Sequence, residues 1–377
     1  MSRLKVGCNL LFLKPGRVGG TEEYVRRLLM ALQTHGADEV DLTLLVNRRF
    51  LDAHGDLAST FTTVVAPITG DVPSIRIGVE SSWLAYQTSR LGFDLVHHPA
   101  NTLPHVRTRP SLVTIHDLQP LMRPGDFGPI KGPYLRGRLR RSAREARVVT
   151  TPSHYVRSLL IDRMGIAGDR VTVVTAPVAS SAPARLGDPP PDDHGVEEPF
   201  FLYPAITHPH KNHETLLRAF ARVAAESPAV SLVLTGGPGS KDHAVTDEID
   251  RLDLHDRVRH LGWVPRIDLD DLLRRAAALT FPSRHEGYGL PVTEAMALGC
   301  PVVASAVTAL PELVGDAGLL VQPDDVEGWV AAMLRLLEDE PRRATLIDLG
   351  AERVRSMTPE HAARRLIDAY RLAVGRR

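Results

Sequence analysis

The sequence is poor in cysteine, has no net charge and lacks any long apolar run. Only Cys8 and Cys300 occur, both inside apolar stretches, which argues against a disulfide framework and for a reducing compartment. Basic and acidic residues number 45 each, and this balance does not favour nucleic acid as a partner. There is no signal-peptide pattern and no run of about 18 apolar residues. We therefore expect a cytoplasmic protein without a membrane span, and peripheral contact with a membrane stays open.

Several catalytic and phosphate-binding fingerprints are also missing. There is no Gly-x-Ser-x-Gly elbow, and neither cysteine has the neighbours of a reactive thiol. The glycine-bearing loops at 14–20 and 236–239 match neither the dinucleotide-binding fingerprint nor the P-loop. Three histidines lie within 208–213, but they lack a carboxylate partner and Lys211 would repel a cation. We expect neither a bound metal nor a cofactor.

What the chain does have is an alternation of apolar strands and amphipathic helices. Residues 5–13 are almost continuously apolar, as in a strand that is buried on both faces of a parallel sheet. A glycine-bearing loop and a helix over about 21–34 follow, and the same order of elements continues to residue 176. This pattern predicts an α/β fold with a doubly wound parallel sheet, in which ligands bind beyond the carboxyl ends of the strands.

One segment interrupts the alternation. Residues 177–199 are rich in proline, small and acidic residues and have no periodicity, which indicates a linker. Strands and helices resume at residue 200. We therefore predict two Rossmann-like domains, an N-terminal one over 1–176 and a C-terminal one over 200–358, that face a cleft suited to a small ligand.

The densest group of unusual residues lies between Phe281 and Ser305, a strand–turn–helix–strand segment. Glu286 falls in the turn and Glu294 on the helix. The glycines of the turn permit positive φ, and the expected row of free backbone N–H groups beside a carboxylate suits a ligand that carries phosphate and hydroxyls. The alternative is a structural unit whose glycines only close a tight turn.

Other candidates lie at strand ends and helix starts. His116 directly follows an apolar strand, where a neutral imidazole could donate to a sugar hydroxyl, or could simply bond local backbone. Lys211 precedes a helix and is a natural counter-charge for a diphosphate. Gly19 and Gly20 lie at a helix N-terminus. Residues 136–147 hold six arginines, which suit an anionic acceptor, a membrane surface or a solvated helix face.

Taken together, these segments resemble a known family. They are similar to the retaining, nucleotide-sugar-dependent glycosyltransferases of family four, the glycosyl transferases group 1, which have the two-domain GT-B fold. The resemblance rests on five segments in the family's order: GGTEEY (19–24), TIHDLQP (114–120), PHKNH (209–213), LGWVP (261–265) and HEGYGLPVTEAMALGCPVVAS (285–305).

The resemblance implies a role for each matching residue. Glu286 would contact hydroxyls of the donor sugar and Glu294 the ribose, while Lys211 would bind the diphosphate. His116 would contact the donor sugar, and the last helix, 359–377, would pack on the N-terminal domain. The glycines of the N-terminal loop, Gly19 and Gly20, would close over the phosphates. Backbone groups near the sugar and diphosphate would be those of Gly287, Tyr288, Gly289 and Leu290.

One segment departs from the family pattern. Many members carry Gly-Arg after the first strand of the second domain, and that arginine joins the lysine on the diphosphate. Here the strand ends Tyr203-Pro204-Ala205, so Lys211 would need help from His208, His210 or backbone dipoles.

The resemblance also implies an activity. We expect transfer of a hexose, with retention, from a nucleotide sugar to a carbohydrate, lipid-linked or small-molecule acceptor. The TIHDLQP and PHKN variants are similar to those of transferases that use GDP-mannose, so mannose from a GDP-sugar is favoured. A sugar-nucleotide epimerase or a phosphorylase on the same fold, and a non-catalytic nucleotide-sugar-binding protein, are the alternatives.

Overall fold

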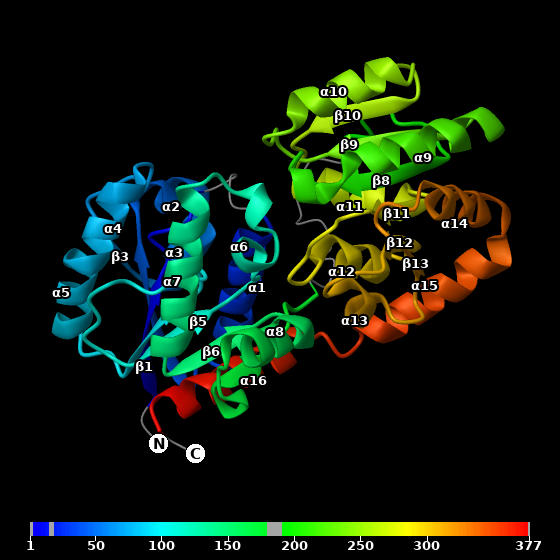
Figure 1. Cartoon of the computed structure of the whole chain (residues 1–377). Coiled ribbons are helices and arrows are strands. Elements are labelled where there is room, and N and C mark those ends of the chain that lie inside the picture. Colours follow the sequence, from blue (N-terminus) through cyan, green and yellow to red (C-terminus); the bar gives the residue numbers. More distant parts are fainter. Residues whose placement is uncertain (1–2, 15–18, 179–190, 376–377) are drawn as a thin grey trace. The chain divides into compact units, whose positions relative to one another are not determined.

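The computed structural model describes residues 3–14, 19–178 and 191–375 (Figure 1). The chain divides into two compact units, which we call the N-unit (Met1–Pro177 with Met357–Arg377) and the C-unit (Val178–Ser356). The predicted linker, 177–199, includes residues 179–190, which lie outside the described residues. None of the described helices is long and apolar enough to cross a membrane.

The N-unit is built on a seven-stranded parallel sheet with the strand order β3-β2-β1-β4-β5-β6-β7. Its strands are β1 Leu4–Asn9, β2 Val40–Val46, β3 Thr62–Val65, β4 Leu95–His98, β5 Ser111–Thr114, β6 Val148–Thr151 and β7 Val171–Val173. Its helices are α1 Gly20–His35, α2 Arg48–Ala53, α3 Gly55–Thr60, α4 Pro73–Ser81, α5 Trp83–Arg90, α6 Gln119–Met122, α7 Lys131–Glu145, α8 His154–Met164 and α16 Pro359–Ala373. The first strand is shorter than predicted, because the chain turns after Asn9 and Leu13 N–H donates to the Leu10 carbonyl.

The C-unit is built on a six-stranded parallel sheet with the order β10-β9-β8-β11-β12-β13. Its strands are β8 Phe200–Pro204, β9 Ser231–Thr235, β10 Val258–Gly262, β11 Ala278–Phe281, β12 Val302–Ser305 and β13 Leu319–Val321. Its helices are α9 His213–Glu226, α10 Asp242–Arg251, α11 Arg266–Arg275, α12 Leu290–Ala297, α13 Leu310–Val314, α14 Val326–Glu338 and α15 Glu340–Val354. The strand order reverses between β8 and β11, and ligands of such sheets bind at the carboxyl ends of the strands at this point. The predicted pair of Rossmann-like parallel-sheet domains is confirmed.

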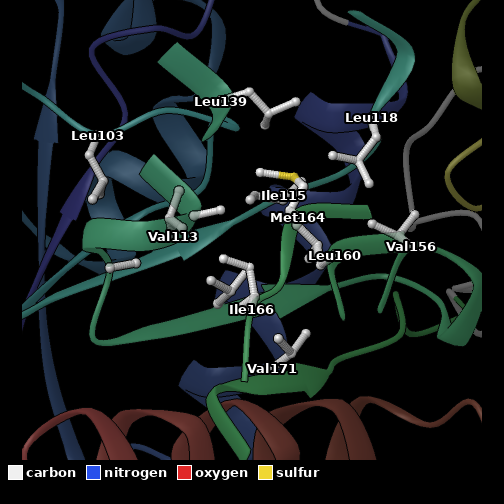
Figure 2. Packing of buried hydrophobic residues seen from close by; sticks show 13 residues of the cluster. Leu103, Val113, Ile115, Leu118, Leu139, Val156, Leu160, Met164, Ile166 and Val171 are labelled. Carbon is white, nitrogen blue, oxygen red and sulfur yellow. The ribbon is translucent and has the colours of Figure 1, made fainter. Parts of the chain in front are cut away.

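An apolar cluster in the N-unit positions the loop that holds His116. It lies between strands β5 and β6 and helices α7 and α8, and Figure 2 shows its side chains gathered in the space between these elements. Ile115 and Leu118 are fully buried in this cluster. Since these two residues flank His116 and Asp117 in the chain, their burial restricts where the loop after β5 can lie.

The last helix belongs to the N-unit. Helix α16 packs against α1, and its Tyr370 hydroxyl lies 2.9 Å from Nδ1 of His97 on β4. The other ring nitrogen of His97 lies 2.7 Å from the Thr114 hydroxyl, which lies 2.8 Å from that of Thr150. A buried chain of polar groups therefore joins α16 to three strands of the sheet, and all of these groups find partners away from water.

Buried histidines make the stability of the fold depend on pH. Burial lowers the pKa of His97 and of His98 from 6.5 to about 3, so both remain neutral in the folded protein. Once unfolded, they bind protons below pH 6.5. Because the unfolded state then holds more protons, stability should fall as the pH is lowered, by up to about 1.4 kcal/mol per pH unit for each such group.

Thermal unfolding measured between pH 7 and pH 5 checks this expectation. The unfolding midpoint should decrease over this range, and His97→Gln should make the decrease shallower because the glutamine does not titrate. The matched control is His255→Gln, since His255 is exposed. A midpoint that stays constant from pH 6.5 to pH 5 would show that the buried histidines do not govern this dependence.

Candidate active site

Two loops at the middle of the C-unit sheet bring Lys211 and Glu286 together. The lysine ammonium lies 2.6 Å from the carboxylate Oε1, and the two side chains are 19% and 13% exposed. Lys211 follows β8 and Glu286 follows β11, and these strands are parallel neighbours. Their carboxyl ends therefore lie at the same edge of the sheet, where the strand order reverses.

The backbone around Lys211 is fixed by side chains on both sides of it. The Tyr203 hydroxyl donates to the Lys211 carbonyl at 2.6 Å. Asn212 adopts a left-handed conformation with φ of 59°, and its amide nitrogen donates to the carbonyls of Pro282 and Pro323 at 3.1 and 2.7 Å. These bonds tie the loop after β8 to the loop after β11. The backbone position from which the Lys211 side chain extends is therefore fixed by contacts within the protein.

The groups around Glu286 favour its ionised form. Burial alone would raise the pKa of this carboxyl, but the Lys211 ammonium and the Ser283 hydroxyl bring it below its usual value. Burial, with the Lys211 charge, lowers the pKa of the neighbouring His210 to about 4. At neutral pH Lys211, Glu286 and His210 thus contribute a cation, an anion and a neutral imidazole to this edge of the sheet. A cation suits a diphosphate, and a carboxylate can accept hydrogen bonds from sugar hydroxyls.

Glu294 lies on α12 and also has a cationic partner. Its Oε1 lies 2.5 Å from Nη1 of Arg266, whose Nε lies 2.7 Å from Asp270 at the first turns of α11. Arg266 was not among the predicted site residues, because nothing in the sequence pattern distinguishes it from any other arginine at a helix start. Asp270 lies one turn after Arg266 on the same helix and pairs with it.

The turn between β11 and α12 requires glycine at position 289. Gly289 has φ of 122°, and a Cβ there would lie 2.9 Å from Leu310 and 3.1 Å from Leu313. Beside the expected row of backbone N–H groups, the N–H of Glu286 itself donates to the Thr308 hydroxyl at 3.1 Å. The remaining predicted residues of this turn are all buried: Gly287, Tyr288 and Leu290.

Gly19 and Gly20 begin helix α1 in the N-unit. Gly19 caps the helix with φ of 58°, Gly20 is its first residue, and both are exposed. Because the N-cap residue is a glycine, it has no side chain of its own to bond the first N–H groups of the helix. The first turn carries two carboxylates, Glu22 and Glu23, whose negative charges interact favourably with the positive end of the helix dipole.

His116 is buried in the N-unit after β5. Its Nε2 lies 3.0 Å from the Pro99 carbonyl, and its backbone N–H donates to the Asn101 side chain at 2.6 Å. The ring packs edge-on against Tyr24, with 4.9 Å between centroids. Burial lowers the pKa of His116. A neutral ring must carry its proton on Nε2 to donate to a carbonyl, so Nδ1 is left as the acceptor for a ligand hydroxyl.

The arginine-rich stretch 136–147 is partly structural. Arg138 points inward and donates to the Leu103 carbonyl at 2.8 Å, and Arg141 pairs with Glu145. In contrast, Arg140 and Arg144 are exposed on α7. Over the described ranges, no group of three or more His, Cys, Asp or Glu residues is placed to hold a metal ion.

Comparisons with known proteins give the family. Residues 18–181 match the family described as Glycosyltransferase Family 4, and residues 198–339 match Glycosyl transferases group 1. The O-antigen chain mannosyltransferase B of Escherichia coli is 32% identical over 287 residues, which are 74% of each chain. The chain belongs to glycosyltransferase family 4. The predicted family and the predicted enzyme class, a glycosyltransferase, are confirmed.

Other relatives and solved structures agree with this assignment. The O-antigen chain mannosyltransferase RfbU of Salmonella typhimurium is 27% identical to this glycosyltransferase over 63% of it and 62% of RfbU. The sucrose-phosphate synthase of Thermosynechococcus elongatus superposes with a TM-score of 0.76 at 23% identity, over 98% of both chains. Anabaena HepE, solved with UDP and glucose, superposes with a TM-score of 0.74 at 19% identity, over 98% of this chain and 99% of HepE. At such identities the structures establish the fold, which is the GT-B fold.

Proposed function

We propose that this glycosyltransferase moves a mannosyl group, with retention, from a GDP-sugar to an acceptor hydroxyl. The observation that carries the proposal is the Lys211–Glu286 pair at the switch point of the C-unit sheet. A cation and an ionised carboxylate side by side suit a diphosphate and the sugar attached to it. The mannosyltransferase names of two relatives favour mannose as the transferred sugar.

In the proposed mechanism, the main electrostatic contribution comes from Lys211. The bond between the anomeric carbon and the diphosphate oxygen breaks, negative charge develops on the diphosphate, and the ammonium group stabilises it. The acceptor oxygen attacks the anomeric carbon from the face that the diphosphate leaves, and its proton passes to the departing phosphate oxygen. Since Lys211 supplies the positive charge, we propose that the reaction requires neither a metal nor a cofactor.

The other site residues orient the donor. Glu286 accepts hydrogen bonds from sugar hydroxyls and lies beside the positive charge that develops at the anomeric carbon. Glu294 exchanges its bond with Arg266 for the ribose hydroxyls. In the N-unit, Nδ1 of His116 accepts a hydrogen bond from the donor sugar, and the loop at Gly19 and Gly20 covers the phosphates.

An exposed face of α7 suggests the class of acceptor. Arg140 and Arg144 lie one turn apart and are exposed, and at the N-terminal end of the helix Ile130 and Tyr134 are 86% and 47% exposed. Basic and apolar side chains together suit the headgroups of anionic lipids. We therefore favour a lipid-linked acceptor and peripheral contact with an anionic membrane over a water-soluble acceptor.

The experiment is a donor screen with the purified protein. GDP-mannose, other GDP-sugars and UDP-sugars are supplied with lipid-linked or soluble acceptors, each with and without anionic vesicles, and released nucleotide is measured. We expect the fastest release from GDP-mannose with a lipid-linked acceptor and vesicles. Release only from UDP-sugars would overturn the donor assignment, and no release from any donor would overturn transfer itself. Epimerised sugar without acceptor, or a requirement for inorganic phosphate, would support the two enzymatic alternatives.

The ribose assignment gives a separate prediction. Glu294→Ala should weaken GDP binding by roughly 10- to 100-fold, because hydrogen bonds to a charged group contribute about 1.5–3 kcal/mol. Calorimetric titration with GDP measures this directly. The control is Glu327→Ala, which removes an exposed carboxylate of the same unit that also pairs with an arginine. If Glu294→Ala binds GDP as tightly as the parent chain, Glu294 does not hold the ribose.

A further inference from the structure

Thr308 has an unusual backbone conformation for its residue type. It lies between β12 and α13 and has φ of 59°. In the described part of the chain, five non-glycine residues have positive φ, and the other four are Asn101, His194, Asn212 and Asp253. Asparagine, aspartate and histidine tolerate the left-handed region, whereas a β-branched residue there is a genuine outlier. Such outliers persist where the surrounding structure holds them, and they cluster at functional sites.

The surroundings of Thr308 fix this conformation. The next two residues, Ala309 and Leu310, are fully buried, and Leu310 packs against the turn at Gly289. The Thr308 hydroxyl donates to the Val307 carbonyl at 2.7 Å and accepts the backbone N–H of Glu286 at 3.1 Å. The strained residue is thus bonded directly to the backbone of the glutamate that pairs with Lys211.

We propose that Thr308 is a positioning residue for Glu286. Three contacts then hold Glu286: its carboxylate bonds Lys211 and Ser283, and its backbone N–H bonds Thr308. The third contact sets the direction in which the side chain leaves the backbone. Thr308 itself need not touch the substrate. This inference rests on the proposed role of Glu286. We infer that the left-handed conformation of Thr308 directs its hydroxyl toward the Glu286 N–H.

A series of variants separates the hydroxyl from the shape of the side chain. Thr308→Ala removes the hydroxyl, while Thr308→Ser keeps it and removes only the methyl group. We expect Thr308→Ala to lower kcat roughly tenfold or more, because small misplacements of site groups are costly, with GDP affinity changed less than about threefold. Thr308→Ser should restore kcat to within about threefold of the parent. A parental kcat in Thr308→Ala, or an equal loss in Thr308→Ser, would overturn the proposal.

A second readout does not depend on activity. Hydrogen exchange of the Glu286 amide should be faster in Thr308→Ala than in the parent and in Thr308→Ser, because its hydrogen-bond acceptor is gone. Unchanged exchange would overturn the positioning role even if no donor is turned over. If the Glu286 amide exchanges faster in Thr308→Ala but the parent protein transfers no sugar, then the proposed function is wrong. The hydrogen bond between Thr308 and Glu286 is still supported in that case.

The control for backbone strain is Asp253→Ala. Asp253 also has positive φ, at 54°, but it lies in the turn before β10. That turn is at the amino ends of the parallel strands, the edge opposite to the one that holds Glu286. Asp253→Ala should leave kcat and exchange at Glu286 at parental values. If Asp253→Ala loses as much kcat as Thr308→Ala, then general destabilisation explains both losses and the proposal is overturned.

Discussion

Replacing Lys211 with alanine should lower the rate of sugar transfer on the order of a hundredfold or more, the usual effect of removing one preorganised group that stabilises charge in a transition state. The Lys211 ammonium lies beside Glu286, and residues 205–212, between β8 and α9, include no arginine. The loss should appear in kcat at saturating donor, because negative charge on the diphosphate develops during bond breaking. Steady-state kinetics with GDP-mannose measures it.

Two further variants make this result specific to the Lys211 charge. Lys211→Arg keeps a cation and should retain more activity than the alanine variant. Arg222→Ala removes an exposed cation of the C-unit that likewise pairs with a glutamate, Glu327, and should have parental kcat. If Lys211→Ala keeps more than about one-third of the parental kcat, then a group other than Lys211 stabilises the charge on the diphosphate.

Glu286→Gln should reduce turnover on the order of a hundredfold while leaving GDP affinity within about threefold of the parent. The amide has nearly the same shape as the carboxylate, so the substitution removes the negative charge that we propose lies beside the anomeric carbon, with little change in packing. GDP itself has no sugar at this position, and its binding should therefore be insensitive. Single-turnover transfer and calorimetric titration with GDP measure the two quantities.

Comparing Glu286 with Glu294 separates a role in turnover from a role in nucleotide binding. Glu294 is assigned to the ribose, so its alanine variant should lose GDP affinity first. Glu327→Gln, at an exposed carboxylate, should change neither quantity. If Glu286→Gln loses GDP affinity as strongly as turnover, then Glu286 contacts the nucleotide and the two roles are wrongly divided.

The sequence pattern predicted the type of fold because buried parallel strands are nearly continuous apolar runs. It could not predict that β8 and β11 are neighbours, since strand order depends on contacts between distant segments. Consequently Lys211 and Glu286 were expected to bind one ligand, through family resemblance, but their direct ion pair was not. The same reason explains why the Arg266–Glu294 pair was missed. Its members lie on different helices, and no local motif links them.

Backbone conformation was the other feature that the sequence concealed. Glycines at 287 and 289 indicated a tight turn, and Gly289 does have positive φ. Nothing in the residue type of Thr308 suggested the same, because β-branched residues rarely adopt it. The bond between His97 and Tyr370 joins residues 273 positions apart. The family resemblance implied that the last helix packs on the N-terminal domain, but it did not imply this bond.

The central claim is that the acceptor attacks from the face that the diphosphate leaves, with Lys211 and Glu286 beside the breaking bond. The most direct test is the anomeric configuration of the transferred sugar in the first-formed product. It is measured by the one-bond carbon–proton coupling at the anomeric centre after transfer from labelled GDP-mannose. We predict the configuration that the sugar has in the donor. Formation of the opposite anomer would contradict this account, because attack would then come from the face opposite the diphosphate.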